Sequence, residues 1–171
     1  GWSSIAMARA YPKVTVDGFD LDPDVVAAAA DNARDTGLDG RVRFAVVDAA
    51  DPGVGGRYDL VTIFEALHDM ARPVDALRAA RAMLSEGGSV VIADERVEDE
   101  FTAPAPDPDR RAYGWSVVSC LPSAMADPET AATGAVLRPA TLAGYADEAG
   151  FHHTEPLAVE AEDWRFYRLL P

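Results

Sequence analysis

The sequence predicts an α/β domain with a mostly parallel, doubly wound β-sheet. Two observations lead to this prediction. Residues 58–66 and 89–95 are apolar along almost their whole length, as strands buried on both faces are. Between them lies a segment with helical spacing of its apolar residues, 73–86. Buried strands that are separated by helices form parallel sheets with helices on both faces.

The first half of the chain alternates between helix and strand. Asp22 and Pro23 are a helix start signal, because aspartate caps the first turn and proline suits the first helical position. Gly37 is a suitable C-terminal cap for the same helix. A further short helix fits before the strand at 58–66. The expected elements are a helix at 2–11, a strand at 14–20, a helix at 23–37, a strand at 41–48, a loop at 51–57, a strand at 58–66, a helix at 73–86 and a strand at 89–95.

Residues 96–138 interrupt this alternation. The acidic, Pro-rich stretch at 96–111 has the composition of a loop. The following stretch at 112–136 carries aromatic and small residues with weak helical character. A long insertion between regular elements is often a lid or a substrate-binding segment, and a plain surface excursion is the alternative.

The last part of the chain returns to regular structure. Pro139 begins a helix at 139–150, and two strands follow at 151–160 and 164–171. The short connection between these strands can form only an antiparallel hairpin, since a parallel crossover needs about a dozen residues. We therefore expect an antiparallel C-terminal strand within one domain that covers residues 1–171.

Composition and charge exclude several classes of protein. The 171 residues suffice for one ordinary domain, and the net charge of −14 would repel a phosphate backbone, so we expect no nucleic-acid binding. No run approaches the roughly 18 apolar residues of a membrane helix, and the first residues lack a signal-peptide pattern. Cys120 is the only cysteine, which excludes an intrachain disulfide and a Cys-based zinc cage and fits a reducing, cytoplasmic setting. We predict no metal site.

Carboxylates stand at the ends of the predicted strands, where open parallel sheets bind their ligands. Asp20, 19 positions after Gly1, has the spacing at which an acidic residue binds the ribose hydroxyls of a nucleotide cofactor. Asp48 is placed to accept a hydrogen bond from an adenine amine. Asp20 could instead cap a loop, and turn aspartates such as Asp48 are common. Asp94 is the weakest candidate, because it could equally solvate the start of the acidic loop.

Several consecutive blocks resemble the class I S-adenosylmethionine-dependent methyltransferases, which have Rossmann-like folds. The resemblance covers nearly the whole chain outside 96–138 and is greatest to small-molecule methyltransferases. It implies that Gly1 is the last glycine of a Gly-rich turn, that the first strand of the sheet is missing from this chain, and that the domain is incomplete at its N-terminus. It also implies a homodimer formed through an upstream region. The blocks are VTVDGFDLDPDVVAAAADNA, VRFAVVDAAD, YDLVTIFEALHDM, ALRAARAMLSEGGSVVIADE and LAGYADEAGFHHTEPL.

The same resemblance implies S-adenosylmethionine as cofactor, S-adenosylhomocysteine as product, and cofactor contacts from four pairs of neighbouring residues. These are Gly1 and Trp2 at the amino-acid end of the cofactor, Asp20 at the ribose with Leu21 beside the adenine, Asp48 at the adenine amine with Ala49 alongside, and Phe64 and Glu65 near the reactive methyl group.

Methyl transfer from a sulfonium is an in-line displacement, so the protein mainly aligns the acceptor and excludes water. His68, just beyond a strand end, is the candidate general base for a hydroxyl acceptor. The more conservative interpretation is a structural histidine bonded to a loop carbonyl, and we favour it. His152 and His153 begin a strand rather than end one, and we assign them no role.

The predicted insertion supplies the candidate substrate contacts Tyr113, Trp115 and Ser116. They could equally be the buried face of a lid helix. Cys120 has no basic neighbour in sequence to stabilise a thiolate, so we do not expect it to act as a nucleophile.

Two other functions remain open. A nicotinamide-dependent dehydrogenase could use Asp20 in the same way, but the only lysine, Lys13, does not complete the Tyr-x-x-x-Lys pair of short-chain reductases. A methyltransferase-like module could also bind a ligand or a partner without catalysis, since a fold does not fix a function.

Overall fold

The computed structural model describes residues 1–51, 53 and 55–171. The chain divides into two compact units, Gly1–Val54 and Gly55–Pro171. Each unit has its own β-sheet and its own hydrophobic cluster. The loop predicted at 51–57 includes residues 52 and 54, which lie outside the described residues.

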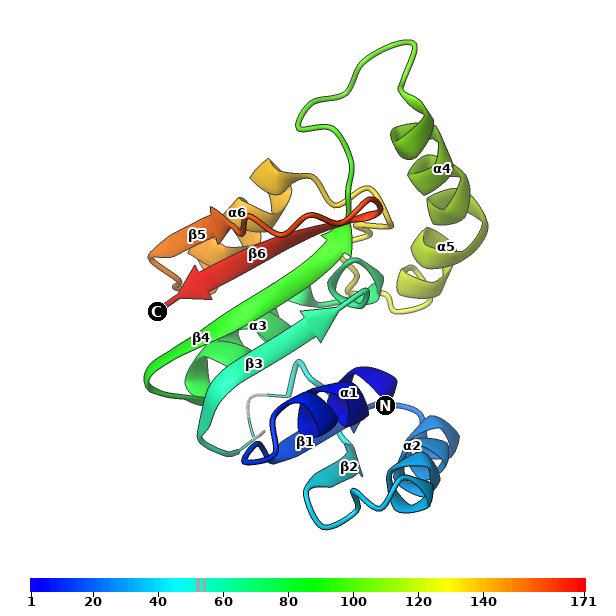
Figure 1. The fold of residues 1–171 in the computed structure, drawn as a ribbon. Coiled ribbons are helices and arrows are strands. Elements are labelled where there is room, and N and C mark those ends of the chain that lie inside the picture. Colours follow the sequence, from blue (N-terminus) through cyan, green and yellow to red (C-terminus); the bar gives the residue numbers. More distant parts are fainter. Residues whose placement is uncertain (52, 54) are drawn as a thin grey trace. The chain divides into compact units, whose positions relative to one another are not determined.

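The first unit holds a two-stranded parallel sheet and two helices (Figure 1). Its apolar cluster joins Ile5 and Ala8 of the first helix to Ala33 of the second and Val42 of the second strand. The elements are α1 (Trp2–Ala10), β1 (Val16–Asp20), α2 (Pro23–Asp35) and β2 (Val42–Val46).

The start of α2 confirms the predicted cap. The side chain of Asp22 accepts hydrogen bonds from the backbone N–H of Asp24 at 2.8 Å and of Val25 at 3.3 Å. These two donors are among those that an α-helix cannot satisfy by itself. Gly37 takes the left-handed conformation, with φ of 69°, just beyond the helix end.

The second unit is built on a four-stranded sheet in the order β3-β4-β6-β5. β3 and β4 are parallel, and β6 runs antiparallel to both of its neighbours, which confirms the predicted antiparallel C-terminal strand. The elements are β3 (Tyr58–Phe64), the 3-10 helix η1 (Leu67–Asp69), α3 (Pro73–Ala82), β4 (Leu84–Glu95), α4 (Asp107–Trp115), the π-helical segment η2 (Ser116–Cys120), α5 (Leu121–Ala124), α6 (Pro139–Glu148), β5 (His153–Pro156) and β6 (Trp164–Leu170).

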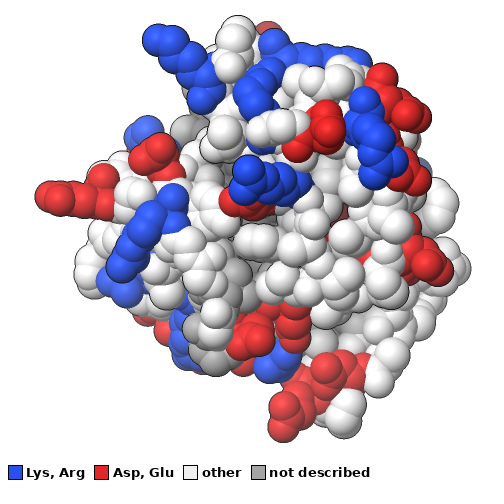
Figure 2. Space-filling view, turned by 90° about the horizontal axis from the view of Figure 1, so that it is seen from below, with Lys and Arg blue, Asp and Glu red and all other residues white. Residues whose placement is uncertain are grey.

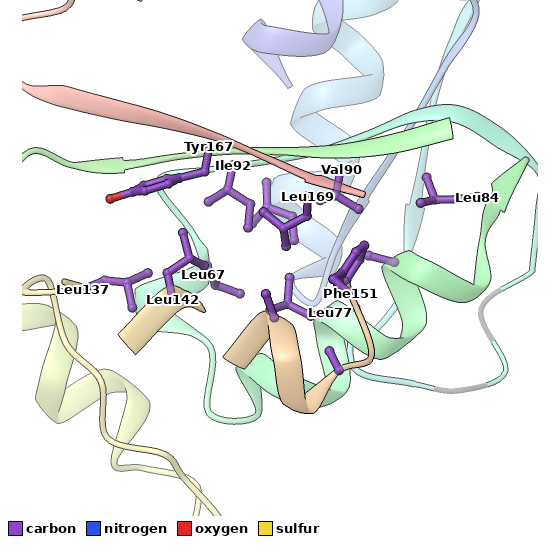
Figure 3. Packing of buried hydrophobic residues seen from close by; sticks show 14 residues of the cluster. Leu67, Leu77, Leu84, Val90, Ile92, Leu137, Leu142, Phe151, Tyr167 and Leu169 are labelled. Carbon is purple, nitrogen blue, oxygen red and sulfur yellow. The ribbon is translucent and has the colours of Figure 1, made fainter. Parts of the chain in front are cut away.

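Helices α3 and α6 pack on one face of this sheet (Figures 1 and 3). Val90 and Ile92 of β4 and Leu169 of β6 meet Leu77 of α3 and Leu142 of α6, and all five are fully buried. This cluster holds the strands rigid, so that the segments following β3 and β4 start from fixed positions.

Several sequence predictions of secondary structure differ from the structure. The helix expected to reach residue 86 ends at Ala82, because Leu84 already pairs with Tyr58, and β4 therefore begins before the Gly87–Gly88 pair. The stretch expected to be a loop up to 111 becomes helical at Asp107.

The early start of α4 has a local cause. Pro108 in the first turn suits a helix N-terminus, where its missing N–H leaves nothing unpaired, and Asp107 and Asp109 favour the positive end of the helix dipole.

No helix lies between β2 and β3 in the described residues; the short helical turn follows β3 instead.

Basic and acidic side chains are interspersed over the face that Figure 2 shows, rather than gathered in a single patch of one sign. Among the described helices, none has the length and hydropathy that a bilayer crossing requires.

Candidate functional site

The carboxyl ends of β3 and β4 bring together several ionisable groups of the second unit. Glu65 directly follows β3, and its backbone N–H donates to the carbonyl of Ala93 at 2.9 Å. Its φ of 50° is unusual for a residue with a side chain. Burial, followed by the charges of Glu95 and Asp94, raises the pKa of Glu65 to about 7, although its carboxylate accepts a hydrogen bond from Trp164. Glu65 therefore titrates near neutrality.

His68 forms a buried pair with Asp94. The histidine sits in the turn η1 and is 3% exposed, whereas Asp94 is the penultimate residue of β4 and is 1% exposed. Nδ1–H of His68 donates to Oδ1 of Asp94 at 2.9 Å, and the same oxygen accepts the backbone N–H of Glu95 at 3.0 Å. Oδ2 of Asp94 has no hydrogen-bond partner within the described part of the chain. The pair fixes the ring with Nε2 on its other side.

The Nε2 side of His68 faces a second carboxylate and a thiol. Nε2 lies 3.4 Å from Oδ1 of Asp69, and the polar atoms of His68, Asp69 and Cys120 all lie within 4.8 Å of one another. Burial by itself would lower the pKa of His68, but the hydrogen bond and charge of Asp94, with the charge of Asp69, raise it above its ordinary value.

Cys120 keeps its proton in this environment. Burial, followed by a hydrogen bond with Asp69 and the charge of that residue, raises the pKa of the Cys120 thiol to about 11. This agrees with the expectation that Cys120 is not a nucleophile. The polar atoms of His68, Asp69 and Cys120 form one close cluster.

In the first unit, the two predicted nucleotide-binding aspartates stand at the strand ends. Asp20 is the last residue of β1, and its Oδ1 accepts the N–H of Asp22 at 3.0 Å. Asp48 follows β2, and its Oδ1 accepts the N–H of Ala50 at 2.8 Å. Each forms a local turn that holds its carboxylate at the carboxyl end of its strand. Both the predicted turn role and a ligand role are compatible with this geometry.

The neighbours of these aspartates differ in exposure. Leu21 is 67% exposed beside Asp20, and Trp2 is 63% exposed at the start of α1. Ala49 is half-buried. Gly1 approaches other side chains closely, since a Cβ there would lie 2.6 Å from the ring of Phe44.

The three predicted substrate contacts differ in their environments. Tyr113 packs edge-on against Phe101, and its hydroxyl accepts a hydrogen bond from Arg138 at 3.3 Å. Trp115 is 59% exposed. Ser116 is buried and lies against the backbone of Gly134, where a Cβ would come within 2.2 Å of its hydroxyl oxygen.

Other predicted or prominent features have partners other than His68. Phe64 ends β3 with its ring edge-on to Phe166, at 6.4 Å between centroids. His153 lies 3.3 Å from Glu155 at the exposed edge strand β5. An open surface cavity of about 580 Å³ is lined by Arg96 and residues 157–162, and it contains none of the predicted site residues.

Sequence reasoning missed the pairing of His68 with Asp94. Each residue was a candidate by itself, but 26 positions separate them. The available signal was topological: two consecutive parallel strands pair side by side, so the residues that follow or end them meet at one edge. The histidine is bonded to a carboxylate, and the loop carbonyl that we favoured as its partner is wrong.

Comparisons with known proteins agree with this architecture. A family model described as "Methyltransferase domain" matches residues 1–135. The chain is similar to a candidate O-methyltransferase from Nostoc punctiforme PCC 73102, with 24% identity and a TM-score of 0.75 over 96% of this chain and 46% of that one. It is also similar to PigF, solved with SAH, with 20% identity and a TM-score of 0.73 over 98% of this chain and 46% of that one.

A third similar structure is NcsB1, an O-methyltransferase from neocarzinostatin biosynthesis in complex with S-adenosyl-L-homocysteine and 1,4-dihydroxy-2-naphthoic acid. The identity is 21% and the TM-score 0.69, over 97% of this chain and 44% of that one. The chain thus spans less than half the length of each of these three proteins.

The fold and the family match together define the class. The chain belongs to the methyltransferase-domain family, and its fold is that of the class I S-adenosylmethionine-dependent methyltransferases. This confirms the resemblance found in the sequence blocks and favours it over the dehydrogenase alternative.

Proposed function

We propose that this protein transfers the methyl group of S-adenosylmethionine to a hydroxyl group of a small-molecule acceptor, with His68 as the general base. The single observation that carries the choice of a hydroxyl acceptor is the buried His68–Asp94 pair. A hydroxyl must lose its proton as it attacks, and a positioned imidazole can accept that proton.

Asp94 acts in this proposal as a positioning residue. Because its carboxylate only accepts hydrogen bonds, the proton on the neutral ring stays on Nδ1, and Nε2 presents its lone pair to the acceptor. The negative charge of Asp94 also stabilises the imidazolium that forms when His68 takes the proton. Asp69, at 3.4 Å, is farther from Nε2 than a strong hydrogen-bond partner would be, so an acceptor hydroxyl that reaches this buried nitrogen would displace a weak contact.

The residues of the first unit fit a nucleoside. Asp20 offers an exposed carboxylate at a strand end, suited to a pair of ribose hydroxyls, and the exposed Leu21 offers apolar surface for an adenine ring. Asp48 would accept from the adenine amine with Ala49 beside it, and Gly1 and Trp2 would approach the amino-acid end. When bound, the cofactor supplies an activated methyl group. Phe64 and Glu65 would lie near that methyl group.

The acceptor-binding part of the proposal assigns residues 96–138 to the substrate. Tyr113, Trp115 and Ser116 belong to the helical run that ends beside His68, because Cys120 lies in the same run. PigF and NcsB1, solved with the demethylated product of this cofactor, support the choice of cofactor. NcsB1 also carries an aromatic hydroxy acid, which supports a small aromatic acceptor.

A non-catalytic or differently catalytic module is the second candidate. The fold also resembles SpnF, described as a [4+2]-cyclase, with 21% identity and a TM-score of 0.62. A methyltransferase-like fold therefore does not by itself require methyl transfer.

Calorimetric titration of S-adenosylhomocysteine into the natural-length protein and into its Asp20→Ala variant tests the cofactor. Micromolar binding that the variant loses supports the ribose role, and the Asp20→Asn variant separates the charge from the side-chain shape. A methyl-transfer screen with phenols and aliphatic alcohols then tests the reaction. Binding without turnover of any acceptor would favour the second candidate, and no binding to a folded protein would refute the cofactor assignment.

A further inference from the structure

An ion pair between a fully buried aspartate and a partly exposed arginine closes the base of the 96–138 insertion. Asp109, on the first turn of α4, is completely buried. Its Oδ1 accepts the backbone N–H of Glu98 at 2.8 Å, and its Oδ2 accepts a hydrogen bond from Arg138 at 3.0 Å. Arg138 also donates to the carbonyl of Glu98. Glu98 lies just after β4 and Arg138 just before α6, so both ends of the insertion are tied to one helix.

The ion pair of Asp109 and Arg138 is well suited to hold the start of α4 in a single position. Moving Arg138 away would leave the completely buried carboxylate of Asp109 without a compensating charge, so the pair disfavours any opening that separates its members. The planar guanidinium of Arg138 donates to three acceptors, on Glu98, Asp109 and Tyr113, which fixes direction as well as distance. The neighbouring Val97 and Leu137 are almost fully buried and exclude water from the same place.

The anchored helix leads directly to the His68 end of the candidate site. Residues 107–124 form one continuous helical run, α4, η2 and α5, without an intervening loop. Cys120 lies near the far end of that run, with Sγ within 4.8 Å of the polar atoms of His68 and Asp69. A tilt of the helix about its anchored start would therefore displace Cys120 relative to Asp69.

We propose that Asp109 and Arg138 are positioning residues that hold the helical run 107–124 so that Cys120 stays against Asp69 and His68. This inference rests on the proposed function in that it concerns the same site. It adds that the helical run 107–124 is held in place at its start by the ion pair of Asp109 and Arg138 and does not move as a lid.

Thiol labelling of Cys120 tests the proposal without any known acceptor. The natural-length protein is treated with 5,5′-dithiobis(2-nitrobenzoic acid) at pH 8, and labelling of the peptide that contains Cys120 is followed by mass spectrometry. In the Arg138→Gln and Asp109→Asn variants, we expect Cys120 to move away from Asp69 and to become more exposed to solvent. A return of its pKa from about 11 toward an ordinary value near 8.5 raises the thiolate fraction on the order of a hundredfold. We expect labelling at least about tenfold faster than in the wild type.

Two controls separate positioning from loss of stability. Arg110→Gln removes an exposed ion pair with Asp107 on the same helix and should not change the labelling rate. Leu142→Ala lowers the stability of the same unit without touching the ion pair. If labelling in the Arg138 and Asp109 variants is no faster than in a Leu142 variant with the same melting temperature, the proposal is wrong.

A paired apolar replacement gives a second discriminating variant. Asp109→Leu with Arg138→Met can restore stability while removing every polar tie to Glu98 and Tyr113. Fast labelling of Cys120 in this stable double variant supports positioning, and slow labelling shows that packing alone holds the helix.

The kinetic arm uses the acceptor found in the methyl-transfer screen. Loss of positioning should raise the KM for the acceptor several-fold, with S-adenosylhomocysteine affinity unchanged. If the cofactor does not bind at all, the proposed function fails, whereas the labelling result still decides the role of the ion pair. An unchanged KM for the acceptor together with an unchanged labelling rate would refute the positioning role of Asp109 and Arg138.

Discussion

Nδ1 of His68 lies 2.9 Å from Oδ1 of Asp94, although the two residues are 26 positions apart in the sequence. The histidine follows β3 through the turn η1, and the aspartate ends the neighbouring parallel strand β4. Pairing of the two strands carries both side chains to one edge. The relationship is therefore a consequence of the topology, and several tests follow from its chemistry.

Replacing His68 with glutamine should lower methyl transfer by about 10²–10⁴-fold, since a general base contributes on that order. The binding of S-adenosylhomocysteine should not change, because the base acts on the acceptor. A parallel calorimetric and kinetic measurement checks both statements. Loss of cofactor binding in His68→Gln would instead indicate a structural histidine.

The Asp94→Asn variant tests the orienting role separately. In the wild type, kcat/KM should rise with pH as His68 loses its proton, with a midpoint above the ordinary histidine pKa. Removing the negative charge should move this midpoint to lower pH and reduce the plateau, because the ring is no longer held in one tautomer. A pH–rate profile with an unmoved midpoint would contradict the assignment of His68 as the base.

The same pair should make stability depend on pH. The folded-state pKa of His68 is raised, so the folded protein binds its proton more tightly than the unfolded chain does. The resulting stabilisation is fully present below the unfolded pKa of about 6.5 and is lost as the pH rises through the folded pKa. Melting temperatures of wild type and His68→Gln from pH 5 to pH 9 should therefore differ most at the acid end. A difference that grows toward pH 9 would contradict this sign.

Glu65 should make the stability of the folded protein depend on pH in a second way, and the Glu65→Gln substitution should remove this dependence. Burial, with the charges of Glu95 and Asp94, raises the pKa of Glu65 to about 7. Ionising this side chain in the folded state is thus unfavourable, and its destabilisation develops between the ordinary pKa near 4.5 and the folded value. Glu65→Gln should melt higher than wild type at pH 8 and should gain less at pH 5. Equal shifts at both pH values would show that charge is not the cause.

The fold was largely predictable, because it depends on short-range patterns. Asp22 and Pro23 start α2 as their residue types require, and the apolar run 58–64 forms a strand, although Ile63 is the one buried residue in it and Leu60 is about half exposed. The site was predictable only in part. Strand-end positions such as Asp20 and Asp94 follow from the sheet, but the pairing of Asp94 with His68 depends on which side of the sheet each side chain takes.

Other features depend on tertiary contacts that no local pattern encodes. Asp109 looks like one of several acidic residues in a Pro-rich stretch, yet it is buried because Arg138, 29 positions later, pairs with it. Tyr113 was predicted as a substrate contact from its aromatic character, and its hydroxyl is held by that same arginine. Composition describes the stretch as a whole and does not distinguish its buried members.

Gly87 and Gly88 show how a local pattern was misread, and they offer a matched pair of variants. The helix expected at 73–86 would end directly before these two glycines, but both lie within β4, where the register to β3 shifts between Tyr58 and Leu60. Gly87 has φ of 76° and open space around its Cβ position, so Gly87→Ala should cost about 1 kcal/mol through backbone strain alone.

Gly88→Ala should be more damaging than Gly87→Ala. A Cβ at Gly88 would lie 2.9 Å from the carbonyl oxygen of Tyr58 and 3.0 Å from that of Ser85, and backbone atoms cannot move aside as a flexible side chain would. We expect a loss of about 2 kcal/mol or more, as for other overpacked sites. Urea denaturation of the two variants gives the comparison directly. If Gly87→Ala proves the more destabilising, the close approach of β3 to β4 at this point is not what requires the glycine.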